Sequence, residues 1–148
     1  LANVAANYLA SGKEAGRYGN GHPNIVPYNA YPTRDGMIAL SVGNDGQFRK
    51  FCQVVGLDAL PDDPGFATNA ARVANRTVLH EKILEALAPM ERAPLLQKLD
   101  AAGVPAAPIN DIGEMFSDPQ AIARGMRMDL DDGHGNSLPS VRSPMVTI

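Results

Sequence analysis

An Asp-Gly pair between two short β-like runs is the feature that most constrains the fold. The runs cover residues 28–32 and 37–42, and Thr33-Arg34-Asp35-Gly36 joins them. Asp-Gly is a strong signal for a tight hairpin turn, because aspartate bonds readily to nearby backbone and glycine tolerates unusual φ values. We therefore predict an antiparallel β-hairpin over residues 28–42.

The remainder of the chain alternates between helical and short β-like patterns. After Gly43, Asn44 or Asp45 can cap a helix that ends at Gly56. Its apolar side chains recur at helical spacing. They are Phe48, Phe51, Cys52 and Val55. Further elements are predicted as helices over residues 1–9, 77–87, 92–102, 111–116 and 118–124, an edge strand over 104–109, and a last hairpin around 131–136. The fold class that follows is α+β, with a small, largely antiparallel sheet and several packed helices.

Composition excludes several classes of function. The formal net charge is −3 and aromatic residues make up 5% of the chain, so nucleic-acid binding is not expected. No run of about 18 apolar residues and no signal-peptide pattern is present, so no membrane association is expected. Three histidines and one cysteine form no spaced ligand set, so we expect no metal. A single cysteine, on a buried helix stripe, favours core packing and a cytoplasmic setting.

A glycine-rich segment, residues 12–27, has no usable periodicity and is predicted to be an irregular loop. Two roles are open for it. Glycines let backbone N–H groups approach a ligand closely, as in a lid or an oxyanion hole, but the same composition suits a flexible linker. His22, directly after the glycines, is in a fair position for binding.

The segment from Gly19 to Cys52, which begins Gly-Asn-Gly-His-Pro, closely resembles the CaiB/BaiF family of class III CoA-transferases. The stretches 1–12, 63–76, 103–108 and 118–126 resemble the same family in the same order. The resemblance implies the small domain of that fold, in three parts. These are the end of a linker helix and an active-site loop (1–27), the small α+β domain (28–130), and a turn that starts the return to a missing large domain (131–148).

Site residues follow from the resemblance and not from spacing. The loop that covers the reactive centre in the family matches Gly19, Asn20, Gly21 and His22, with Asn20 and His22 as departures from the all-glycine-then-glutamine pattern of some relatives. A second region, near CoA in some relatives, matches Gly43, Asn44 and Asp45. Helix capping explains Asn44 equally well.

The family moves CoA from an acyl-CoA to a carboxylic acid through an aspartyl-CoA intermediate. Its nucleophilic aspartate would lie upstream of Leu1, so we expect no catalytic residue here and no turnover by this chain alone. Acyl-CoA and an acceptor acid are the expected partners, with coenzyme A as acyl carrier, in an interlocked homodimer. The alternatives are an α-methylacyl-CoA racemase of the same superfamily and a noncatalytic CoA-binding or assembly module.

Overall fold

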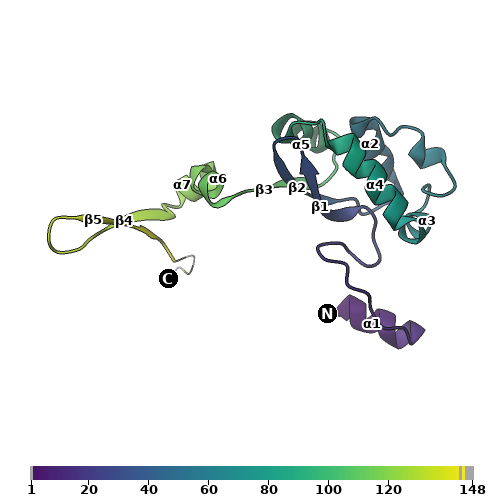
Figure 1. Ribbon diagram of the computed structural model, residues 1–148, viewed down its shortest axis with the longest axis horizontal. Helices are drawn as coiled ribbons and strands as arrows, with labels where there is room; N and C mark the ends of the chain where they lie inside the picture. Colours follow the sequence, from purple (N-terminus) through teal and green to yellow (C-terminus); the bar gives the residue numbers. More distant parts are fainter. Residues whose placement is uncertain (1, 144, 146–148) are drawn as a thin grey trace. The chain divides into compact units, whose positions relative to one another are not determined.

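The computed structural model describes residues 2–143 and 145, and its internal contacts divide the chain into two compact units (Figure 1). The first unit is Leu1–Ile109 and the second is Asn110–Ile148. The end of the predicted return segment, at residue 144 and residues 146–148, lies outside the described residues. The three-part domain division made from the sequence stays a prediction.

A three-stranded antiparallel sheet organises the first unit. Its order is β1 (Tyr28–Thr33), β2 (Gly36–Ser41), β3 (Ala106–Ile109), so the predicted hairpin and edge strand are confirmed. The hairpin turn differs in detail from the expected one, since Arg34 and Asp35 are its central residues and Gly36 already pairs with Thr33. A Cβ on Gly36 would lie 2.9 Å from Nη1 of Arg92, the end of a flexible side chain that can move aside, and the φ of Gly36 is not positive, so neither packing nor turn geometry demands glycine here.

Helices cover one face of this sheet. The helical elements of the first unit are α1 (Ala2–Ser11), α2 (Asp45–Val55), the 3₁₀ turn η1 (Leu60–Asp62), α3 (Asn69–Ala74), α4 (Arg76–Leu87) and α5 (Arg92–Ala101). Helix α4 contacts β1, and α5 contacts β2 and β3; Figure 1 shows these helices gathered beside the strands. Ile38 and Leu40 of β2 point into the core, where Phe51, Leu79 and Ile83 are fully buried. The alternating residues Met37 and Ala39 lie on the exposed face.

The second unit is small and largely exposed. It contains α6 (Ile112–Ser117), α7 (Pro119–Ala123) and the antiparallel hairpin β4 (Arg127–Asp131) with β5 (Ser137–Val141). A capping box between Asp111 and Glu114 begins α6. In the hairpin loop the Asp132 carboxylate accepts hydrogen bonds from the backbone N–H groups of His134 and Asn136. His134 is thus a loop residue.

The α+β class is confirmed. Within the described part of the chain, no helix is long and apolar enough to cross a bilayer.

Candidate functional site

A cavity of about 270 Å³ lies where the glycine-rich segment meets β1 and the start of α4. We call it the loop–α4 cavity. Its wall combines charged, aromatic and small residues from these three elements. They are Arg17, Tyr18, Gly21, His22, Ile25, Val26, Tyr28, Asn29, Tyr31, Arg76, Thr77 and His80. Gly21 and His22 of the predicted covering loop therefore line a cavity.

A tight turn shapes the loop at the cavity edge. The N–H of Gly21 donates to the carbonyl of Tyr18 at 2.8 Å, with Gly19 inside the turn at φ 58°. That φ favours glycine, because other residues are strained there. A Cβ on Gly21 would lie 3.0 Å from the same Tyr18 carbonyl oxygen. Gly19 is therefore favoured by its φ, and Gly21 by the nearby backbone oxygen.

Arg76, the first residue of α4, holds the end of the loop. Its Nη1 donates to the carbonyl of His22 at 3.3 Å and its Nη2 to the carbonyl of Pro23 at 2.5 Å. The guanidinium carbon lies 4.7 Å from the centre of the Tyr18 ring, in cation–π geometry. One arginine thus joins the turn, the residues after it and a helix of the core.

His22 is oriented by its neighbours. Its Nδ1 accepts a hydrogen bond from the backbone N–H of Asn24 at 3.0 Å, and its ring centre lies 5.3 Å from that of Tyr28. An Nδ1 that accepts has no proton, so the neutral ring has its proton on Nε2. No described residue forms a hydrogen bond with that Nε2. His22 lines the cavity, and its Nε2–H remains free to donate to a ligand.

Tyr31 of β1 reaches the cavity from the core side. Its side chain is only 2% exposed, and no described residue forms a hydrogen bond with its phenol oxygen. The ring of His80 on α4 lies 5.2 Å away. Burial raises the pKa of the Tyr31 phenol well above its ordinary value, so the group remains a protonated donor.

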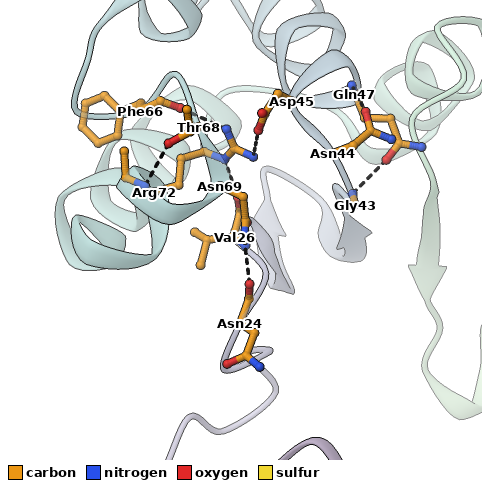
Figure 2. A network of polar contacts seen from close by, with 11 residues as sticks. Asn24, Val26, Gly43, Asn44, Asp45, Gln47, Phe66, Thr68, Asn69 and Arg72 are labelled. Carbon is orange, nitrogen blue, oxygen red and sulfur yellow. Dashed lines mark hydrogen bonds and ion pairs between the residues drawn. The ribbon is translucent and has the colours of Figure 1, made fainter. Parts of the chain in front are cut away.

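A buried arginine fixes the segment that leads from the loop into the sheet (Figure 2). Arg72 of α3 is fully buried. Its Nε donates to the Val26 carbonyl at 2.7 Å, its Nη1 to the Phe66 carbonyl at 3.0 Å, and its Nη2 to Asp45 Oδ1 at 2.8 Å. Asn69 adds two bonds, from Nδ2 to the Asn24 carbonyl and from the Val26 N–H to Oδ1. The end of the loop is therefore rigidly placed beside the cavity.

The second predicted region, Gly43 to Asp45, does not line the loop–α4 cavity. Asn44 Oδ1 caps α2 by accepting from the N–H of Gln47 at 2.9 Å, and Gln47 Oε1 accepts from the N–H of Gly43 at 2.8 Å. Asp45 is engaged with Arg72 (Figure 2). These contacts are those of a helix start, and the expected CoA contact of the three residues stays a prediction.

The two remaining loop residues lie apart from the cavity wall. Asn20 lines a hollow over the exposed sheet face, together with Tyr28, Asn29 and Ala39, while Gly19 lines neither hollow. Among the described residues no cluster of three histidine, cysteine or carboxylate side chains could hold a metal ion. Cys52 is fully buried, and burial raises the pKa of its thiol to about 12.

Sequence reasoning missed Tyr31, Arg76 and His80 as cavity residues. His80 is half-buried, and its ring contacts that of Tyr31. No local pattern marks these three residues, since they meet only when α4 packs on β1. The one related signal in the sequence is that Arg76 belongs to the stretch 63–76 that resembles the family.

Comparison with known proteins gives one consistent family. The family model described as "CoA-transferase family III" matches residues 1–147. The chain is 47% identical over 146 residues to a "Succinate--glutarate CoA-transferase" of Agrobacterium fabrum, covering 99% of this chain and 36% of the relative. It is 37% identical over 131 residues to the human "Succinyl-CoA:glutarate CoA-transferase", covering 88% of this chain and 30% of that one.

A solved structure agrees with these relatives. A CAIB/BAIF family protein from Brucella suis matches with a TM-score of 0.83 and 46% sequence identity, over 99% of this chain and 38% of that chain. This chain thus spans about a third of the length of the proteins that it matches.

Proposed function

Because the chain belongs to CoA-transferase family III, we propose that it is part of an enzyme that moves CoA from an acyl-CoA to a dicarboxylic acid. The observation that carries this proposal is 47% identity along 99% of the chain to a succinate–glutarate CoA-transferase. The human relative is likewise named for succinyl-CoA and glutarate. Succinate and glutarate both have a second carboxylate, which is the basis for the proposed substrate class.

The proposed reaction proceeds by covalent catalysis at an aspartate outside this chain. The aspartate attacks the thioester carbonyl of the donor, which gives a mixed anhydride and free CoA thiolate. The thiolate attacks the aspartyl carbonyl, releasing the donor acid and leaving aspartyl-CoA. The acceptor carboxylate attacks that thioester and frees the thiolate again, and the thiolate takes the acceptor acyl group and restores the aspartate.

Within that scheme the chain covers the reacting groups. The turn at Gly19 and Gly21 provides a close-fitting backbone, and its attachment through Arg76 places His22 at the cavity. Water exclusion by such a cover protects anhydride and thioester from hydrolysis. Gly43, Asn44 and Asp45 are proposed to approach CoA. We also propose that the enzyme is an interlocked homodimer and that it is cytoplasmic. A cytoplasmic location is compatible with the free, buried thiol of Cys52.

The experiment uses the enzyme that contains this chain, with succinyl-CoA and glutarate as substrates. We expect glutaryl-CoA and succinate to form in equal amounts, and we expect the 148-residue chain alone to form neither. Turnover by the chain alone would refute the position proposed for the nucleophile.

A second arm separates transfer from racemisation. A racemase moves the proton at the α-carbon, so in D₂O it would introduce deuterium into a 2-methylacyl-CoA. Deuterium incorporation without CoA transfer would replace the proposal with the racemase alternative.

A further inference from the structure

We propose that the loop–α4 cavity binds the carboxylate of the acceptor acid that does not react. This inference rests on the proposed function for the identity of the acid. It assigns binding roles to Arg17, Tyr31 and His22, and it makes the cavity the element that selects dicarboxylic acids.

The charge of the cavity wall suits an anion. The wall contains two arginines and two histidines and no aspartate or glutamate. Arg76 uses both terminal nitrogens on the His22 and Pro23 carbonyls. Arg17, in contrast, has an exposed guanidinium for which the described part of the chain provides no hydrogen bond and no ion pair. A guanidinium can bind a carboxylate through two parallel N–H donors.

Two neutral donors, Tyr31 and His22, line the same cavity. The Tyr31 phenol has no hydrogen-bond partner among the described residues, and since none of their buried polar side-chain atoms is left unpaired, its oxygen stays within reach of water or of a ligand in the cavity. His22 has a free Nε2–H because Nδ1 is engaged by Asn24. Three donors from Arg17, Tyr31 and His22 fit the acceptor capacity of a carboxylate, which has about four lone-pair sites.

The size of the cavity is compatible with this ligand. At about 270 Å³ it holds a carboxylate and the short carbon chain next to it, since one water molecule takes up about 30 Å³ of liquid. Apolar wall atoms from Ile25 and Val26 would contact the methylenes. A phosphate group, such as those of CoA, is the other anion that the same donors would accept, and the experiment separates the two.

The test is a titration of the 148-residue chain, observed by NMR through the amide and histidine ring signals. The probes are glutarate, its neutral diamide and inorganic phosphate. We expect glutarate to shift the signals of Gly21, His22 and Tyr31 with a dissociation constant of roughly 1–10 mM, and the diamide to bind at least about tenfold more weakly. Absence of cavity shifts at about 50 mM glutarate would overturn the proposal. Phosphate binding about tenfold tighter than glutarate would overturn it in favour of a phosphate site.

Variants make the assignment specific to residues. Arg17→Gln and Tyr31→Phe are each expected to weaken glutarate binding about fivefold or more, since each removes one donor to a charged group. Lys13→Gln is the matched control, because it removes the same charge from the same loop outside the cavity, and it should change binding less than about twofold. Equal effects of Arg17→Gln and Lys13→Gln would refute a built site.

Failure of this binding proposal can be distinguished from failure of the proposed reaction. A chain that binds glutarate in this cavity, together with an enzyme that transfers no CoA, would refute the proposed function alone. Transfer to glutarate by an enzyme whose cavity binds no carboxylate would refute only this inference.

Discussion

Replacement of the buried Arg72 by methionine should strongly destabilise the first unit. Arg72 joins three segments that are distant in the sequence, through the carbonyls of Val26 and Phe66 and the carboxylate of Asp45 (Figure 2). Its guanidinium also lies 4.3 Å from the centre of the Phe48 ring. Methionine fills a similar volume and keeps apolar packing, so the substitution removes mainly the polar contacts.

The magnitude follows from the burial of each partner. Val26 and Phe66 are each 7% exposed, so both carbonyls lose a donor without gaining water, at about 1–3 kcal/mol each. The Asp45 side chain is 55% exposed, so loss of that ion pair adds at most about 1 kcal/mol. Loss of the contact with the Phe48 ring adds about 1 kcal/mol, and the apolar methionine offsets part of the total. We expect a net loss of about 3–5 kcal/mol in the free energy of unfolding.

Urea unfolding of the chain, followed by far-ultraviolet circular dichroism, measures this loss. Arg49→Met is the matched control, because Arg49 pairs with Asp62 on the surface and both side chains are at least half exposed. That control should leave the free energy of unfolding nearly unchanged, because water and salt screen the exposed pair. An Arg72→Met variant no less stable than the Arg49→Met variant would refute the account of the buried network.

Three further predictions concern the turn, a helix cap and the thiol. Gly21→Ala should weaken glutarate binding in the NMR titration severalfold, because the new Cβ would lie 3.0 Å from the Tyr18 carbonyl oxygen; unchanged binding would contradict the close turn. Asn44→Ala should cost about 1 kcal/mol in thermal unfolding by removing the cap of α2, and a neutral effect would argue against the cap. Burial raises the pKa of Cys52 to about 12 from 9.0, so its contribution to stability is complete below pH 9 and is lost as pH rises toward 12. Cys52→Ala should therefore reduce the decline of stability over that range by up to about 1.4 kcal/mol per pH unit. Urea unfolding at several pH values measures this difference. An identical decline in both proteins would contradict the burial of the thiol.

Local patterns predicted most of the elements. The helix stripe ending in Val55 is buried as expected, with Asn44 at its start and Gly56, at φ 76°, at its end. The hairpin of β1 and β2 has the predicted position because its Asp-Gly turn signal and the alternation of buried and exposed residues in β2 are both local features. Such features depend on neighbours in sequence, which is why a single chain reveals them.

Tertiary contacts could not be predicted in the same way. Arginine is seldom fully buried, so nothing in the sequence separated Arg72 from the exposed Arg49. The difference arises only when α3 packs beside residues 24–26 and leaves two carbonyls that need a donor. The cavity is similar, since Tyr31, Arg76 and His80 meet through the packing of α4 on β1.

Selection of dicarboxylic acids by the loop–α4 cavity is tested by the ratio of kcat/KM for CoA transfer to glutarate and to butyrate, measured in the enzyme that contains this chain before and after Tyr31→Phe. Butyrate has only the reacting carboxylate, so it cannot use the loop–α4 cavity in the proposed way. We expect the variant to lower the glutarate-to-butyrate ratio about fivefold or more, the equivalent of one lost hydrogen bond to a charged group. A ratio that is the same in both enzymes, or an enzyme that transfers CoA to neither acid, would contradict it.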